Sequence, residues 1–267
     1  MQIEFYKYQG TGNDFVMIDN RSGFFPKENV QLIAHLCDRR FGIGSDGLIL
    51  LEKNPISSII AMPADFKMVY YNSDGNEGSM CGNGGRCTVA FAKKLNIIND
   101  SCMFMAADGW HHASVDESGI ISLKMIDVSN IKLETDYTFM NTGSPHHVQL
   151  VEDLEHYNVK ENGAALRYGP LYGKDGSNIN FVKKINDDTF SLRTYERGVE
   201  DETLACGTGA TAVAIAMNAI GQTNATSINL NVEGGKLAVS FDKKEGIYTN
   251  VFLIGPAKFV FKGVIEI

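Results

Sequence analysis

A repeated cysteine–glycine motif constrains the fold of this sequence more than any other feature. The segment Cys81-Gly-Asn-Gly-Gly-Arg-Cys-Thr-Val-Ala reappears in outline as Cys206-Gly-Thr-Gly-Ala-Thr-Ala-Val-Ala, nearly half the chain later. A tyrosine and polar residues precede both copies, at the end of a predicted strand. Similarity at so large an offset is typical of a duplicated unit. The sequence therefore predicts two halves, each containing a strand, a polar loop, Cys-Gly-x-Gly and a helix.

The pattern of strands and helices predicts the fold class. Short runs of β-branched and aromatic residues, bounded by turn residues, recur throughout the chain. Helical periodicity is confined to Lys27–Cys37, Gly84–Leu95 and Gly209–Ile220. Because helices do not alternate regularly with strands, a Rossmann-like parallel sheet is disfavoured. We expect an α+β fold of two pseudo-symmetric domains, each a mainly antiparallel sheet wrapped around a central helix.

The domain boundary is expected near the middle of the chain. With 267 residues, the chain is long enough for two domains of about 130 residues each. We place the N-terminal half at residues 1–127 and the C-terminal half at 128–255. Because Gly255-Pro256 interrupts the last strand run, residues 256–267 are expected to cross back and complete the N-terminal half.

Charge and hydropathy exclude several classes of partner. The net charge is -8, from 24 Lys and Arg against 32 Asp and Glu, without a basic cluster. Nucleic acid and anionic membranes are therefore not expected partners. The N-terminus lacks a basic segment followed by an apolar run, and no stretch approaches the ~20 apolar residues that a membrane span requires. These features predict a cytoplasmic protein that acts on a small molecule.

The five cysteines are expected to be free thiols. An odd number, without a secretion signal, argues against a disulfide framework. Cys81 and Cys87 are too far apart in sequence for a Cys-x-x-Cys metal site, and the two His-His pairs have no such partner, so no metal site is predicted. Buried structural cysteine is the commoner role for any single Cys, and we assign Cys37, Cys87 and Cys102 to it. The shared flanking sequence sets Cys81 and Cys206 apart.

A cysteine at a helix start is well placed for acid/base chemistry. The first backbone N–H groups of a helix have no intrahelical partner, and the helix dipole is positive there. The dipole stabilises a thiolate by roughly 1–2 kcal/mol and thereby lowers the thiol pKa. Glycines let the backbone approach a bound carboxylate closely. Each motif therefore predicts an ionisable thiol beside an anion site.

Two such thiols suit the inversion of an α-carbon. One thiolate removes the α-hydrogen from one face while the other thiol delivers a proton to the opposite face, and the roles exchange in the reverse reaction. Two helix N-termini at the substrate carboxylate would stabilise the charge that develops there and replace a cofactor as electron sink. With reactive contacts of ~3–3.5 Å on each side, the sulfurs would lie roughly 7 Å apart. The motifs thus predict a cofactor-independent amino-acid racemase or epimerase.

Over essentially its full length, the chain resembles the diaminopimelate epimerase family. The segments that carry the resemblance are Gly10-Thr-Gly-Asn-Asp-Phe15, Phe41-Gly-Ile-Gly-Ser-Asp46, Asn72-Ser-Asp-Gly75, Cys81-Gly-Asn-Gly84, Gly143-Ser-Pro-His146, Ser177-Asn178, Glu196-Arg-Gly198 and Cys206-Gly-Thr-Gly209. Each alone is a weak signal, and together they are specific. The resemblance implies interconversion of LL- and meso-2,6-diaminopimelate in lysine and peptidoglycan-precursor synthesis, without cofactor or metal. It also implies a homodimer.

The resemblance assigns roles to individual residues. It places the catalytic thiols at Cys81 and Cys206, the same pair that the repeat indicates. The groups that it places on the reacting carboxylate are the backbone N–H groups of Gly82, Asn83, Gly207 and Thr208. The side chains that it places at the distal end of the substrate are Asn13, Asn72, Asn178, Glu196 and Arg197. It also implies that His146 and Glu196 modulate the pKa of the thiols.

Other interpretations remain open. Ser144 and Gly47 stand where many or some family members carry Asn and Gln, which leaves substrate choice open toward another amino acid such as histidine or a hydroxyproline. Without the adjacent cysteine motif, Glu196-Arg197 would be read as an ordinary surface pair. A fold relative without racemase activity is a further alternative. Such a protein would be expected to lack at least one of the two thiols, and both are present.

Overall fold

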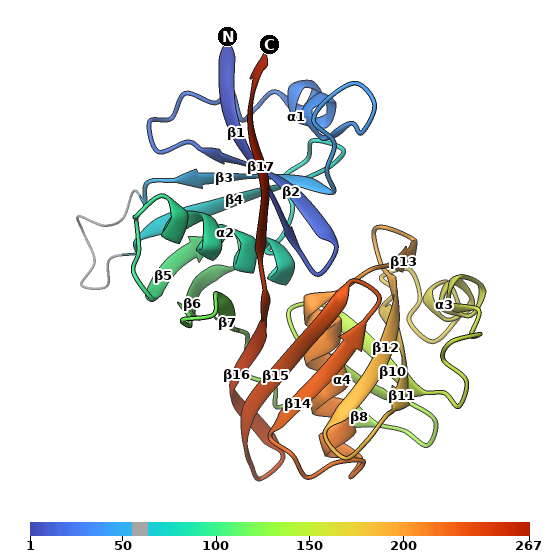
Figure 1. The fold of residues 1–267 in the computed structure, drawn as a ribbon. Coiled ribbons are helices and arrows are strands. Elements are labelled where there is room, and N and C mark those ends of the chain that lie inside the picture. The colour runs from blue at the N-terminus through green and yellow to red at the C-terminus, as the bar shows by residue number, and fades with distance from the viewer. Residues whose placement is uncertain (55–63) are drawn as a thin grey trace. The chain divides into compact units, whose positions relative to one another are not determined.

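The computed structural model describes residues 1–54 and 64–267, which form two compact units (Figure 1). Unit 1 comprises Met1–Leu123 together with Pro256–Ile267, and unit 2 comprises Lys124–Gly255. Unit 2 begins slightly ahead of residue 128 because Met125 N and Val128 N donate hydrogen bonds of 2.8 Å to Val251 O and Tyr248 O. Within the described ranges, no helix is long and apolar enough to cross a membrane.

Unit 1 is built on a mixed sheet. Its strands are β1 (Gln2–Gly10), β2 (Asn13–Asp19), β3 (Gly47–Glu52), β4 (Phe66–Asn72), β5 (Ser101–Ala106), β6 (Gly109–Val115), β7 (Ile120–Lys124) and β17 (Lys258–Glu266). They follow the order β17-β1-β2-β3-β4-β5-β6-β7, in which β2–β3 and β4–β5 are parallel and the other pairs antiparallel. Helix α1 (Val30–Cys37) connects β2 to β3, and α2 (Gly82–Lys94) connects β4 to β5. β17 lies beside β1 and brings the C-terminus next to the N-terminus (Figure 1).

Unit 2 repeats this arrangement. Its strands are β8 (Ile131–Leu133), β9 (Thr138–Asn141), β10 (Pro145–Leu150), β11 (Asn178–Lys184), β12 (Thr189–Glu196), β13 (Asp201–Thr203), β14 (Ser227–Val232), β15 (Gly235–Lys244) and β16 (Ile247–Pro256). They follow the order β8-β9-β10-β11-β12-β14-β15-β16, and β13 also pairs with β12. β10–β11 and β12–β14 are parallel and the other pairs antiparallel. Helix α3 (Val159–Arg167) connects β10 to β11, and α4 (Gly207–Ala219) follows β13 and leads into β14.

The two units therefore share one sequence of strand pairings. In each, a parallel pair, an antiparallel pair, a second parallel pair and two antiparallel pairs follow one another along the sheet. In each, a Cys-Gly helix makes the second parallel connection. α2 and α4 are buried along most of their lengths, as expected for helices that a sheet surrounds. This arrangement confirms the predicted α+β fold with a duplicated, mainly antiparallel sheet around a central helix.

Some predicted elements differ from the structure. The helix expected over Lys27–Cys37 begins at Val30, because the Asn29 side chain accepts a hydrogen bond from Leu32 N at 3.0 Å and caps the helix there. β6, β8, β9, β10, β13 and α3 were not predicted. In α3, Gly163 lowers helix propensity, yet a Cβ at that position would lie 2.4 Å from Tyr195 Cβ. Close packing of α3 on β12 therefore requires Gly163, and this glycine weakens the helical pattern from which α3 could have been predicted.

Candidate active site

Cys81 and Cys206 occupy equivalent positions in the two units. Each is the N-cap of its helix, with φ and ψ of -107° and 122° at Cys81 and -114° and 114° at Cys206. Neither side chain caps its own helix, so each sulfur contacts groups on other residues. Cys206 is 7% exposed and Cys81 is partly buried. Two thiols thus begin two central helices, where the helix dipole favours negative charge.

Asn13 connects Cys81 to its surroundings in unit 1. Cys81 Sγ donates to Asn13 Oδ1 over 3.6 Å, and Asn83 Nδ2 donates to the same oxygen over 3.4 Å. Asn13 Nδ2 donates to Asp46 Oδ2 at 2.7 Å. This bond fixes the orientation of the Asn13 amide and turns its oxygen toward Cys81. The structure therefore brings together three predicted site residues, Cys81, Asn83 and Asn13.

A network of charges holds Asp46 beside Asn13. Arg39 Nη2 donates to Asp46 Oδ1 and to Asp14 Oδ1, each at 2.7 Å. Lys7 Nζ lies 2.7 Å from Asp14 Oδ2. Burial alone would raise the pKa of Asp14, but hydrogen bonds from Arg39 and Lys7 outweigh it and lower that pKa to about 2. Asp14 therefore stays ionised at neutral pH.

Arg86 lies behind the first turn of α2 and was missed from the sequence. It is the largest fully buried side chain, and within the described part of the chain it forms no ion pair with a carboxylate. Its guanidinium donates to Asn83 Oδ1 at 3.0 Å, to Thr11 Oγ1 at 3.1 Å and to Gly82 O at 3.4 Å. Burial lowers the pKa of Arg86, and the nearby thiols of Cys87 and Cys81 act in the opposite direction. Arg86 thereby turns Asn83 Nδ2 toward Asn13 and places a positive charge near the thiol.

In unit 2, Thr208 is the immediate neighbour of the Cys206 sulfur. Thr208 Oγ1 lies 3.4 Å from Cys206 Sγ, 2.9 Å from His146 Nε2 and 3.2 Å from Ser144 Oγ. His146 is fully buried at the start of β10. Burial, and to a lesser extent the charge of Arg197, lowers the pKa of His146 to about 3, so the imidazole is neutral at neutral pH. The structure thus connects His146 to Cys206 through one hydroxyl group.

Two asparagines of β11 fix this cluster. Asn178 Nδ2 donates to Ser144 Oγ at 3.1 Å and to Pro145 O at 3.0 Å, while its Oδ1 accepts from Arg197 N at 2.9 Å. Asn180, a residue that sequence reasoning missed, donates to His146 Nδ1 at 3.1 Å. The parallel register of β10 and β11, which pairs His146 with Asn178, brings Asn180 to His146 and Asn178 to the neighbouring Ser144 and Pro145. No pattern in the sequence signals Asn180 as part of the site.

The remaining predicted residues lie at strand ends next to the two motifs. Asn72 ends β4 and is exposed. Glu196 ends β12, where its Oε2 accepts from Thr203 Oγ1 at 2.9 Å. Arg197 follows and is exposed, and its Nη1 donates to Asp175 O at 3.0 Å. Unit 1 therefore carries Asn13, Asn72 and the Cys81 motif, and unit 2 carries Asn178, Glu196, Arg197, His146 and the Cys206 motif.

Steric crowding explains why position 47 carries glycine. A Cβ at this position would lie 2.5 Å from Tyr71 O and 2.6 Å from Cε2 of Tyr70. A larger side chain therefore does not fit without rearrangement of β4. The Tyr70 ring lies where a side chain from position 47 would begin, and it is also within 2.8 Å of a Cβ built on Gly78. Gly47, where some family members carry Gln, thus lies against the aromatic ring of Tyr70, close to Asn72.

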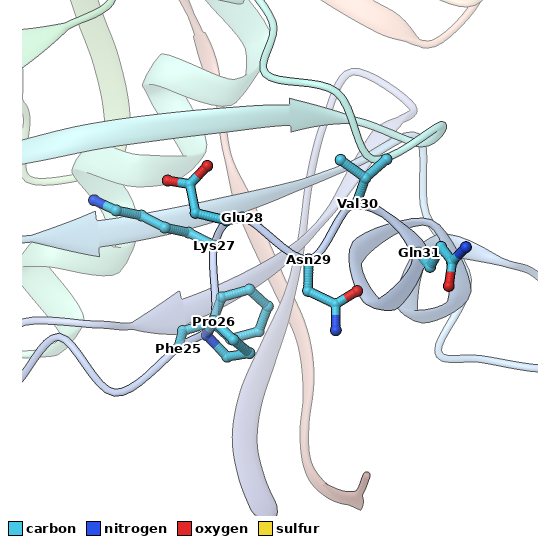
Figure 2. A pocket seen from close by; sticks show the side chains of 7 residues that line it. All are labelled: Phe25, Pro26, Lys27, Glu28, Asn29, Val30 and Gln31. Atoms are coloured by element: carbon cyan, nitrogen blue, oxygen red, sulfur yellow. The ribbon is translucent and has the colours of Figure 1, made fainter.

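One surface hollow in the described part of the chain lies apart from the predicted site residues. A hollow of about 740 Å³ lies at the start of α1 in unit 1, lined by residues 25–31 (Figure 2). Its side chains include Lys27, Glu28 and Asn29, and none of the predicted site residues. In residues 1–54 and 64–267, no group of three or more His, Cys, Asp or Glu side chains is arranged to hold a metal ion.

The fold is shared with solved structures of low sequence identity. A phenazine biosynthesis protein of the PhzF family from Bacillus anthracis superimposes with a TM-score of 0.75 at 15% identity, covering 100% of both chains. A hydroxyproline epimerase from Agrobacterium vitis gives a TM-score of 0.68 at 12% identity, covering 99% of this chain and 92% of the other. These likenesses define the class of fold, a duplicated α+β architecture.

Sequence comparison identifies the family. The diaminopimelate epimerase family model matches residues 5–128 and 138–260. A diaminopimelate epimerase from Flavobacterium psychrophilum is 61% identical, covering 98% of this chain and 100% of the relative. One from Chlorobaculum tepidum is 39% identical, covering 97% and 99%. The chain belongs to the diaminopimelate epimerase family, as the sequence motifs predicted.

Proposed function

We propose that this chain interconverts LL- and meso-2,6-diaminopimelate, with Cys81 and Cys206 as its two acid/base groups and without a cofactor. The observation that carries the proposal is the equivalent placement of both cysteines as helix N-caps in a family member. The enzyme is an isomerase of lysine and peptidoglycan-precursor biosynthesis. Its two half-sites, one on each unit, are proposed to act together on one small-molecule substrate.

The proposed reaction is a proton exchange at one carbon. One thiolate takes the α-hydrogen and becomes a thiol, while the other thiol gives its proton to the opposite face and becomes a thiolate. Backbone N–H groups of Gly82, Asn83, Gly207 and Thr208 are proposed to hold the reacting carboxylate and the negative charge that develops on it. Because the two sulfurs exchange roles, the reverse reaction starts from the protonation state that the forward reaction leaves.

Recognition of the distal end is proposed to rest on polar groups near the two motifs. A second carboxylate calls for a guanidinium fork, and the exposed Arg197 supplies one. A second ammonium calls for a carboxylate, which Glu196 supplies. Asn13, Asn72 and Asn178 would complete the pocket. Asn178 already uses both Nδ2 hydrogens internally, so its contribution to the substrate would come from Oδ1.

A second candidate is an epimerase of the same fold for another amino acid, such as histidine. Ser144 and Gly47 favour it, because they depart from the common family residues at positions expected near the distal end. Incubation with LL-diaminopimelate in D₂O, without metal or pyridoxal phosphate, separates the two candidates. Deuterium at the α-carbon together with meso product supports the proposal, provided that glutamate, proline and histidine stay inert. If another amino acid incorporates α-deuterium and diaminopimelate does not, the proposed substrate is wrong and the thiol mechanism stands.

The proposed assembly is a homodimer formed through β17. This strand pairs with β1 along one edge and carries several exposed apolar side chains, including Val260 at 52% and Val264 at 60% exposure. Exposed apolar edge strands are templates for pairing with another chain. Light scattering is expected to give a dimer mass for the native chain and a monomer mass for Val264→Glu. A native monomer at micromolar concentration would reject the dimer.

The proposed setting is the cytoplasm, with no nucleic-acid or membrane partner. The biosynthetic reaction and the net charge of -8 support this setting. Co-purification with nucleic acid that survives high salt would argue against it.

A further inference from the structure

Two buried amides in unit 2 have fixed orientations. Asn180 Nδ2 donates to His147 O at 2.8 Å, and Asn180 Oδ1 accepts from Thr194 Oγ1 at 3.0 Å. Asn178 Oδ1 accepts from the backbone N–H of Arg197, while its Nδ2 donates to Pro145 O. Backbone groups cannot exchange donor and acceptor roles. Asn180 Nδ2 therefore also donates to His146 Nδ1, and Asn178 Nδ2 also donates to Ser144 Oγ.

The Asn180 amide determines the tautomer of His146. Asn180 Nδ2 lies 3.1 Å from His146 Nδ1, so Nδ1 accepts a hydrogen bond and carries no proton. A neutral imidazole then carries its hydrogen on Nε2. That hydrogen points to Thr208 Oγ1 at 2.9 Å and Ser144 Oγ at 3.0 Å. His146 is consequently a hydrogen-bond donor to the hydroxyl pair.

The hydroxyl hydrogens can then be assigned. Ser144 Oγ accepts from Asn178 Nδ2, and its own hydrogen can go to Thr208 Oγ1 at 3.2 Å, since His146 Nε2 is already a donor. Thr208 Oγ1 thus accepts from Ser144 and His146 and uses both of its lone pairs. Its hydrogen is left for Cys206 Sγ at 3.4 Å. In this arrangement Thr208 Oγ1 is the donor in its contact with Cys206 Sγ.

We infer that Asn180 is a positioning residue that sets the direction of a hydrogen-bond relay through His146 and Thr208 to Cys206, so that the ligand-free enzyme holds Cys206 ready as the thiolate base. The inference rests on the proposed function and extends it to the protonation state. A hydroxyl that donates to sulfur stabilises the thiolate form. At Cys81 the direction is opposite, because Asn13 Oδ1 accepts the thiol hydrogen and stabilises the neutral form. Arg86 and the N-terminus of α2 act against this bond at Cys81, whereas at Cys206 the Thr208 hydroxyl and the N-terminus of α4 both favour the thiolate.

Gly209 gives independent support for the role of Asn180. A Cβ on this motif glycine would lie 2.5 Å from Asn180 Oδ1 and 3.4 Å from His146 Cε1. The Cys-Gly-x-Gly turn and the relay therefore depend on each other sterically. The elements packed here also carry His147 on β10, and Glu196 and Arg197 at the end of β12. The Arg197 charge reinforces burial in keeping His146 neutral.

Nitrogen-15 NMR of the imidazole in the native, ligand-free enzyme tests the tautomer without any substitution at the site. A His146→Gln variant assigns the signal. The expected result is a neutral ring protonated at Nε2, with Nδ1 as acceptor. A ring protonated at Nδ1 would overturn the inference.

Alkylation of Cys206 by iodoacetamide at neutral pH, followed peptide by peptide, tests the effect on sulfur. Thr208→Val and Asn180→Leu are expected to slow it about tenfold or more, because each removes or misdirects the hydrogen bond to the thiolate. Thr211→Val is the matched control on α4, since Thr211 Oγ1 donates to Gly207 O at 3.0 Å instead of contacting sulfur. An unchanged rate in Thr208→Val would overturn the relay. Epimerase activity of Cys206→Ala tests the proposed function separately, because the alkylation and NMR readouts do not depend on turnover.

Discussion

Replacement of Gly209 by alanine tests how the second motif is built. The new Cβ would lie 2.5 Å from Asn180 Oδ1 and 3.3 Å from Cys206 Cβ. Asn180 cannot retreat freely, because hydrogen bonds to His147 O and Thr194 Oγ1 hold it at 2.8 and 3.0 Å. Overpacking of this kind costs about 1–3 kcal/mol, while the better helix propensity of alanine returns at most about 1 kcal/mol. We therefore expect a net loss of about 1–2 kcal/mol in the free energy of unfolding.

Gly84 supplies the matched control, because it holds the same position in the first motif. Its Cβ would meet Cδ1 of Ile49 at 3.0 Å and Cε of Met68 at 3.3 Å, the far ends of flexible side chains that can shift. Gly84→Ala is therefore expected to change stability little. Thermal unfolding of both variants should show a melting temperature several degrees lower for Gly209→Ala than for Gly84→Ala. Equal melting temperatures would refute the steric reasoning at Asn180.

Further predictions concern the distal pocket and the acidic network. Arg197→Ala is expected to raise KM for diaminopimelate more than tenfold with a smaller change in kcat, because a charged hydrogen bond to the second carboxylate is lost. Lys184→Ala on β11 serves as a surface control. An unchanged kcat/KM in Arg197→Ala would remove Arg197 from the site. Because the folded pKa of Asp14 lies below its usual value, at about 2, its ion pairs stabilise the protein above about pH 4 and lose this effect as the pH falls toward 2. Denaturant titrations of Asp14→Asn should accordingly show a flatter loss of stability between pH 4 and 2 than the native chain, and parallel curves would contradict that account.

The features that sequence reasoning predicted well are local. A cysteine followed by glycines and an apolar helical pattern predicts a helix start, and both helices begin directly after their cysteines, two residues ahead of the predicted Gly84 and Gly209. The duplication followed from comparing the two motifs, without knowledge of the sheet. In the structure, β16 ends at Pro256, and Pro256–Ile267 belongs to unit 1. Such signals lie within a few residues of each other and depend little on the rest of the fold.

The features that were missed depend on contacts distant in sequence. Asn180 is one polar residue in an apolar run, and only the parallel pairing of β10 with β11 brings it to His146. Arg86 in a helical pattern suggests a solvent-exposed position, whereas the loop at Thr11 and the backbone at Pro256 O enclose it. Tyr70 contacts Gly47 across β3 and β4, so neither residue alone indicates the other. Tertiary packing, which the sequence pattern does not encode locally, selects these residues.

Exchange of the α-hydrogen by single-thiol variants tests the two-thiol mechanism most directly. Cys81→Ala and Cys206→Ala, each incubated with LL- and with meso-diaminopimelate in D₂O, are followed for α-deuterium and for the opposite epimer. Neither variant is expected to form the opposite epimer, because each face of the α-carbon needs its own proton carrier. Cys87→Ala, which removes a fully buried thiol, is the control and should retain epimerisation. Near-native epimerisation by either Cys81→Ala or Cys206→Ala would contradict the two-thiol mechanism.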